Sequence, residues 1–247
     1  KYTIRLKDLN TGDNFPEKIT NTTGTAIWAN DDKTVFYTIK DTTLRPYKVM
    51  KHIVGTDPAN DEEIYHEKDS TFSVYITKSR SDKYILLESY HTLSTETRLI
   101  DADQPERPAV LFQERERDHE YFVYHHTDRF FVLTNWNARN FRLMQTPIEH
   151  TSKGSWEEVV PHRENVLFEN VNVFRDYLVL GERIDGLRQI RIRDLREKND
   201  HYIEFDENVY TAFPSDNYEF DTRKLRFKYT SLTTPTTTYD YEMASRE

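Results

Sequence analysis

The chain contains no cysteine, so neither disulfide bonds nor thiolate metal ligands can contribute to its structure. It has only six glycines among 247 residues, and none of them lies in a G-x-S-x-G, G-x-G-x-x-G or P-loop pattern. Its apolar runs are too short to cross a membrane as a helix. These absences exclude an α/β-hydrolase nucleophile and a phosphate-binding loop from this segment, and we expect no cofactor.

Positive charge is also scarce: the 34 Lys and Arg residues are outnumbered by 43 Asp and Glu residues, which gives a net charge of −9. An acidic surface disfavours nucleic acid and anionic membranes as partners, since both reward basic surfaces. Without cysteine and without a recognisable leader peptide, the sequence favours a cytoplasmic protein. The chain begins at Lys1 rather than Met, and we expect it to be part of a longer protein.

Aromatic residues are plentiful, at 13% of the chain, with 16 Tyr and 14 Phe. Disordered chains are poor in such residues, whereas strands with one buried face are rich in them. A chain of two-faced strands can stay polar overall, because only alternate side chains need burial. The composition therefore predicts an ordered all-β fold.

Short β-branched and aromatic runs recur along the chain and are separated by turn residues. The first strand of each cycle begins about 41–48 residues after the last one, which is the spacing of four-stranded propeller blades. The predicted strands are 25–29, 34–39, 47–54 and 63–65; 72–77, 84–89, 97–101 and 109–112; 120–125, 129–134, 141–146 and 156–160; 168–174, 177–182, 187–193 and 202–205; and 209–213, 225–230 and 237–241.

Residues 4–9 (IRLKDL) closely match residues 190–195 (IRIRDL), about four repeat lengths further along. The match indicates that the chain opens on the third strand of an earlier blade. We therefore predict a β-propeller of four-stranded antiparallel blades, with about four complete blades and a partial blade at each end. Residues 1–247 would form a single, partial propeller domain.

In such blades the loops between second and third strands emerge on the same side as the connections between blades. The predicted loops are 40–46, 90–96, 135–140 and 182–186, and the connections are 67–70, 113–118 and 162–165. Charged loops often form only a solvated face, but such a face can also dock another domain. Our hypothesis is that Asp41, Arg45, Arg139 and Asn140 make polar contacts with another domain.

Other chemically suggestive residues favour structural roles. His125 and His126 are adjacent and should point to opposite faces of a strand, which makes a poor metal site. The acidic pairs within 61–63 and 157–158 raise the possibility of glycosidase chemistry, but neighbouring acids on a strand diverge.

Two further features concern packing. The basic run Arg188, Arg191 and Arg193 predicts ion pairs across neighbouring strands. The apolar run around Trp28 predicts that this indole packs between two blades.

Several runs resemble the propeller domain of the prolyl oligopeptidase family, and within it the oligopeptidase B (protease II) group. They are 23–31 (TGTAIWAND), 35–38 (VFYT), 41–49 (DTTLRPYKV), 52–56 (HIVGT), 134–143 (TNWNARNFRL) and 231–235 (SLTTP). The resemblance covers essentially the whole chain.

This resemblance implies a seven-bladed ring, of which the chain holds the later part, and a Ser-Asp-His peptidase domain after Glu247. It implies that the parent enzyme cleaves short peptides after Arg or Lys and that the propeller limits entry to the active site. The family's catalytic triad and specificity-pocket residues belong to the peptidase domain, and no position of this chain corresponds to them. A free-standing propeller that serves as a protein-interaction scaffold and a propeller glycosidase are the alternatives.

Overall fold

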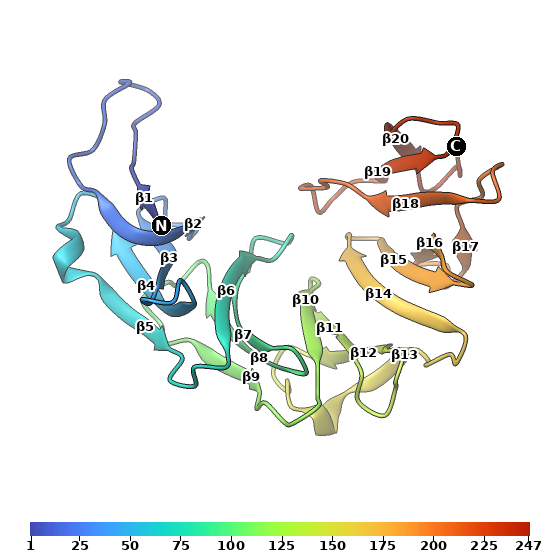
Figure 1. The fold of residues 1–247 in the computed structure, drawn as a ribbon, viewed down its shortest axis with the longest axis horizontal. Helices are drawn as coiled ribbons and strands as arrows, with labels where there is room; N and C mark the ends of the chain where they lie inside the picture. The colour runs from blue at the N-terminus through green and yellow to red at the C-terminus, as the bar shows by residue number, and fades with distance from the viewer. The chain divides into compact units, whose positions relative to one another are not determined.

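The computed structural model describes residues 1–247 and consists almost entirely of strands (Figure 1). Its only helical segments are two single 3₁₀ turns, Pro58–Asn60 and Lys153–Ser155. The strands form five separate antiparallel sheets, which confirms the predicted all-β class. The chain folds as two compact units, Lys1–His119 and Glu120–Glu247. It contains no helix that is long and apolar enough to cross a membrane.

The first unit holds two sheets, with strand orders β1-β2-β3-β4-β5 and β6-β7-β8-β9. The strands of the first sheet are β1 (Tyr2–Ile4), β2 (Ile19–Trp28), β3 (Thr34–Lys40), β4 (Pro46–Ile53) and β5 (Glu62–His66). Those of the second are β6 (Ser73–Lys78), β7 (Tyr84–His91), β8 (Ser94–Asp101) and β9 (Val110–Gln113).

The second unit holds three sheets, of four, four and three strands. The first contains β10 (Tyr121–His125), β11 (Arg129–Thr134), β12 (Arg142–Pro147) and β13 (Glu157–Val160). The next contains β14 (Val166–Val173), β15 (Tyr177–Ile184), β16 (Leu187–Asp194) and β17 (Asp200–Tyr202). The last contains β18 (Tyr210–Pro214), β19 (Lys224–Ser231) and β20 (Thr237–Glu242).

Strand β2 lies between β1 and β3. Its first half pairs with β1, Thr22 pairs with both neighbours, and the register of its pairing with β3 shifts between Thr22 and Ala26. Gly24 lies at this shift with φ +94°, a conformation that side chains disfavour, and a Cβ there would lie 3.2 Å from the Tyr2 ring. Sequence patterning predicted the second half of β2 but missed its first half.

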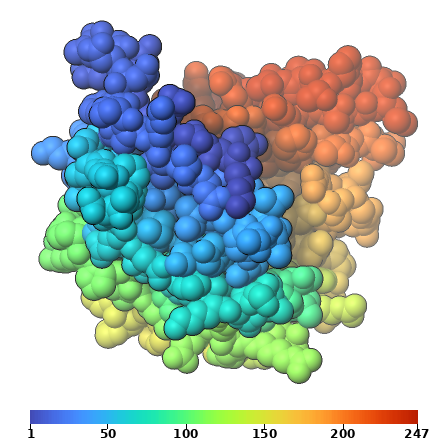
Figure 2. Space-filling view, turned by 60° about the vertical axis from the view of Figure 1, so that its left-hand side comes forward, coloured from blue at the N-terminus to red at the C-terminus, as the bar shows by residue number.

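Residues 4–9 and 190–195 do form the same turn, but the prediction that the chain opens on the third strand of an earlier blade is wrong, because β1 pairs with β2 and is the edge strand of the first, five-stranded sheet. The Asp8 carboxylate accepts the amides of residues 10 and 11 at 2.7 and 3.2 Å, and the Asp194 carboxylate accepts those of residues 196 and 197 at 2.7 and 3.0 Å. The next side chain differs in burial, because Leu195 packs on an apolar core whereas Leu9 is 89% exposed. The loop that carries Leu9 projects from the first unit (Figures 1 and 2).

Apolar cores lie between neighbouring sheets within each unit. In the first unit Phe36 and Val49 of one sheet pack with Ile76 and Leu87 of the next. In the second unit one cluster joins the first two sheets and another joins the last two. Because side chains alternate along a strand, one sheet can contribute to a core on each of its faces, as the sheet β14–β17 does.

This alternation overturns the expectation for Trp28. Ala29 is buried and Ile27 packs against the same core, so the residue between them faces the other way. Trp28 is 42% exposed and does not pack between two sheets of this chain.

Candidate functional site at the loop–connector junctions

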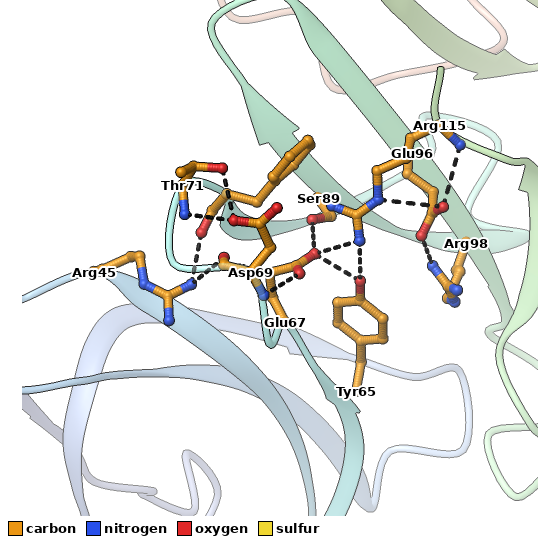
Figure 3. A network of polar contacts seen from close by, with 10 residues as sticks. Arg45, Tyr65, Glu67, Asp69, Thr71, Ser89, Glu96, Arg98 and Arg115 are labelled. Carbon is orange, nitrogen blue, oxygen red and sulfur yellow. Dashed lines mark hydrogen bonds and ion pairs between the residues drawn. The ribbon is translucent and has the colours of Figure 1, made fainter. Parts of the chain in front are cut away.

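In the first unit, the loop between β3 and β4 meets the connector between β5 and β6, as the topology predicted. The Arg45 guanidinium donates to the backbone oxygens of Asp69, at 3.1 Å, and Phe72, at 2.7 Å (Figure 3). The Asp69 carboxylate in turn accepts hydrogen bonds from the amide and hydroxyl of Thr71 at 2.9 and 2.7 Å. Arg45 therefore fastens loop 41–45 to connector 67–72.

Asp41 organises the loop from its base. One carboxylate oxygen accepts the Thr43 amide at 2.8 Å, the Thr43 hydroxyl at 2.7 Å and the Arg45 amide at 3.1 Å. The other oxygen pairs with the Arg45 side chain at 3.0 Å. The hydrogen bond from the Thr43 hydroxyl, together with those from Arg45, lowers the pKa of Asp41 to about 2. The loop is therefore tightly fixed at neutral pH.

In the second unit, Asn140 has the role that Arg45 has in the first. Its side-chain amide donates to the backbone oxygens of Arg163, at 3.3 Å, and Glu164, at 2.8 Å. Its own backbone oxygen accepts the Phe168 amide at 3.0 Å, so the loop before β12 is joined to the start of β14. Arg139, by contrast, is exposed, and no hydrogen bond or ion pair ties it to the chain.

The four predicted site residues thus divide into two kinds. Asp41, Arg45 and Asn140 hold loops and connectors together within their own units, whereas Arg139 presents an unengaged guanidinium to solvent. Their contacts with another domain remain a hypothesis, for which Arg139 is the most available residue.

Beside the Arg45 junction lies a carboxylate that sequence reasoning missed, Glu67, which is only 2% exposed. It accepts hydrogen bonds from Ser89, from the Tyr65 hydroxyl at 2.9 Å and from Arg115 at 2.9 Å (Figure 3). Its other oxygen accepts the Asp69 amide at 2.9 Å. Burial alone would raise the pKa of Glu67, but these hydrogen bonds and the Arg115 charge bring it below its ordinary value.

A second buried carboxylate, Glu96, continues the network (Figure 3). It pairs with Arg98 and accepts the backbone amide of Arg115 at 3.2 Å. The Arg98 guanidinium lies 4.7 Å from the centre of the Tyr65 ring, and that of Arg115 lies 4.1 Å from the centre of the Phe72 ring. Connector 114–119 is therefore held by both charge and cation–π contacts.

The second unit contains a similar network, centred on a glutamate of strand β15. Glu182 is fully buried, pairs with Arg163 and Arg191, and accepts the Tyr202 hydroxyl at 2.6 Å. As in the first unit, a buried glutamate, a tyrosine from an outer strand and an arginine from a connector come together. Such charge-assisted contacts fix the paths of the connectors.

The arrangement positions backbone and offers no reaction chemistry of its own. Each buried glutamate is neutralised by arginine, and the Ser89 hydroxyl is engaged as a donor to Glu67. The sequence did not reveal these glutamates, because in a polar segment a buried acid cannot be told from a surface acid. The available signal was the alternation of acids and bases in residues 114–117 (ERER), which contains Arg115, the partner of Glu67 and Glu96.

The other candidates also behave as structural residues. Asp61 accepts the Tyr37 hydroxyl at 2.8 Å and lies 2.7 Å from a ring nitrogen of His52, whereas Glu62 and Glu63 pair with separate lysines. These acids diverge as predicted. In the other acidic run Glu157 accepts a hydrogen bond from Gln145 and Glu158 pairs with Arg142, so neither run shows two carboxylates directed at one point.

Two of the three arginines of β16 make the predicted ion pairs with a neighbouring strand, since Arg191 and Arg193 pair with Asp200 on β17. Arg188 pairs instead with Glu169 on β14, on the far side of β15.

Separate antiparallel sheets of three to five strands, linked by connectors that are clamped to second-to-third-strand loops, are consistent with a β-propeller domain. Residues 1–247 match the family described as the prolyl oligopeptidase N-terminal β-propeller domain. The chain belongs to this family.

Two curated relatives match the whole chain. It is 37% identical to dipeptidyl aminopeptidase BI of Pseudoxanthomonas mexicana and 34% identical to protease 2 of Moraxella lacunata. It spans 34% and 36% of their respective lengths, or about a third of each.

Solved structures agree with this assignment. Oligopeptidase B from Leishmania major matches all of the chain with a TM-score of 0.93 and 27% identity, over 36% of its own length. Oligopeptidase B from Trypanosoma brucei, solved in a closed form with covalently bound antipain, matches 93% of the chain with a TM-score of 0.88 and 30% identity, over 34% of its own length.

Proposed function

We propose that this chain is the propeller domain of a serine oligopeptidase and that it restricts the active site to short peptides. The observation that carries the proposal is the match of all 247 residues to the family's propeller domain. The clamped loops and connectors support it, because a filter must keep its shape while substrates press against it. The partner is an α/β-hydrolase peptidase domain of the same polypeptide.

We further propose that the whole enzyme cleaves after Arg or Lys in the cytoplasm. Similarity to protease 2 and to oligopeptidase B supports this specificity, and the net charge of −9 favours approach of basic peptides. The absence of cysteine suits a reducing compartment. A second candidate is release of amino-terminal dipeptides, because one relative carries the name dipeptidyl aminopeptidase BI.

The test uses the full-length protein and two matched series of fluorogenic peptides. One series has blocked amino termini and Arg, Lys or Ala before the reporter, and the other has free amino termini. We expect blocked Arg and Lys substrates to be cleaved and blocked Ala substrates to be spared. Cleavage of free dipeptide substrates alone would favour the second candidate, and no cleavage by an intact protein would favour an interaction scaffold.

The filtering role has its own test, a series of peptides of increasing length with one internal Arg. We expect kcat/KM to fall steeply once the peptide is too long or too structured to enter. A folded protein with exposed arginines should resist cleavage. Equal cleavage of short peptides and folded proteins would refute the filter.

Arg139→Glu tests the proposed contact between domains. Arg139 is exposed and makes no hydrogen bond or ion pair within the chain, so the substitution should leave folding intact. We expect it to change peptide hydrolysis or the closed fraction measured by small-angle scattering. Arg45→Glu should do the same but would also release loop 41–45. Unchanged kinetics together with an unchanged closed fraction for Arg139→Glu would rule out the contact.

A further inference from the structure

Leu44, at the tip of the loop between β3 and β4, combines two unfavourable properties. Its φ is +70°, in the left-handed region that bulky side chains avoid, and its side chain is 56% exposed. Most other non-glycine residues with positive φ in this chain are Asp or Asn, which tolerate that conformation. Nothing within the chain explains why a leucine occupies the position.

The corresponding loop of the second unit provides an internal comparison. Phe141 also has a positive φ, of +66°, and it too directly precedes an arginine at the entry to the next strand: Arg142 is the first residue of β12, and Arg45 is the residue before β4. Phe141, however, packs against an apolar core, with its ring 6.4 Å from that of Phe122. Core packing compensates the backbone strain at Phe141, and no such packing compensates it at Leu44.

The loop holds Leu44 firmly rather than letting it relax. Asp41 and Arg45 bracket it through four hydrogen bonds, and Arg45 is fastened to connector 67–72 (Figure 3). A strained residue that persists only because its surroundings over-determine it is typical of functional positions. The anchored loop therefore displays an apolar side chain at a fixed place.

A second exposed leucine flanks the same connector. Leu93, 50% exposed, lies in the turn between β7 and β8, just after His91. The His91 ring is 5.4 Å from the ring of Phe72, the residue whose backbone oxygen accepts Arg45. The connector thus links two loops that each present a leucine to solvent.

We propose that Leu44, assisted by Leu93, is an apolar contact through which this domain docks onto the peptidase domain of the same polypeptide. This inference rests on the function proposed above. The chain spans about a third of its curated relatives, so each of those proteins has about twice its length of further polypeptide, and a similar oligopeptidase B has been solved in a closed form. Closure would bury both leucines, which is the gain that offsets the strain at Leu44.

The test is Leu44→Asn in the full-length protein, because asparagine accepts positive φ but removes the apolar contact. We expect the thermal midpoint to stay at or above that of the wild type, while the closed-to-open ratio from small-angle scattering falls about fivefold. Amides of residues 41–45 should lose the protection from hydrogen exchange that closure gives them. Leu44→Met should retain closure.

Leu9→Asn is the matched control, since Leu9 is 89% exposed and lies in a different turn, and Leu9 itself does not have a positive φ. An unchanged closed-to-open ratio in Leu44→Asn, or an equal fall in Leu9→Asn, would overturn the proposal. A raised KM with an unchanged closed-to-open ratio would mean that Leu44 contacts the substrate, and this result would also contradict the proposed docking contact. Peptidase activity of the wild type is measured in parallel, so its absence would refute the proposed function separately.

Discussion

Asp41 and Glu67 are both carboxylates with lowered pKa values, yet they differ in what they stabilise. Asp41 belongs to an exposed loop, and its hydrogen bonds fix only that loop. Glu67 is 2% exposed and gathers donors from β5, from β7 and from connector 114–119. Loss of Asp41 should therefore loosen a loop, whereas loss of Glu67 should weaken the seam between two sheets.

We predict that Glu67→Gln lowers the free energy of unfolding at neutral pH by about 2 kcal/mol, because hydrogen bonds to a buried charge are lost. The folded pKa of Glu67 lies below its ordinary value of 4.5, so its contribution is complete above that pH and is lost as the pH falls through the lowered value. The difference between wild type and variant should therefore shrink in acid. Denaturant unfolding at several pH values measures it, and a constant difference would contradict the assignment.

Elements built on local chemistry were predictable from sequence. Short β-branched and aromatic runs bounded by turn residues located strands such as β7 and β15, and Asp185-Gly186 marked the hairpin between β15 and β16. Both residues of this turn have positive φ, 49° and 84°, which suits the right-handed twist of the strands. The first half of β2 was not predictable, because its pairing depends on the distant strand β1.

Gly186→Ala should destabilise the protein by about 1 kcal/mol, because alanine is strained at positive φ although open space surrounds the site. Gly154→Ala is the matched control, since Gly154 is equally uncrowded and does not have positive φ. Thermal unfolding of both variants measures the difference. Equal melting temperatures would show that the turn conformation does not limit stability.

At the scale of the whole molecule, the repeat found in the sequence is a repeat of structure. The Asp8 and Asp194 turns share their hydrogen bonds, but Leu195 is covered by an apolar core and Leu9 is not. Sequence similarity therefore fixes the form of the turn without fixing its surroundings. The exposure of Trp28 has the same origin, because burial depends on which sheets lie alongside.

We predict that Leu195→Asn lowers the free energy of unfolding by about 1–2 kcal/mol, through loss of a half-buried apolar contact. Leu9→Asn, at the equivalent position of the other turn, should change it by less than about 0.5 kcal/mol. Chemical denaturation of both variants decides between them. Similar losses would mean that Leu9 is also covered in solution.

The candidate site was predictable only in part for a related reason. Topology correctly brought loop 40–46 to connector 67–70, because strand order fixes which ends of a sheet meet. Topology could not show that the side chains of Arg45 and Asn140 would form hydrogen bonds within the chain, nor that Glu67 would be buried. Those outcomes depend on side-chain packing between sheets, which a single sequence does not encode as a pattern.

Each of the five sheets has its own hydrogen-bonded ladder, and no ladder passes from one sheet to the next. Neighbouring sheets within a unit are joined instead by apolar side chains, by single backbone bonds such as Asn30 to Ala102 and Phe168 to Asn140, and by side-chain contacts such as those of Glu67. A load that separates two such sheets can break these contacts one at a time, whereas a load that separates two paired strands must break a ladder of backbone hydrogen bonds. We therefore expect neighbouring sheets to part under load before any one sheet loses a strand.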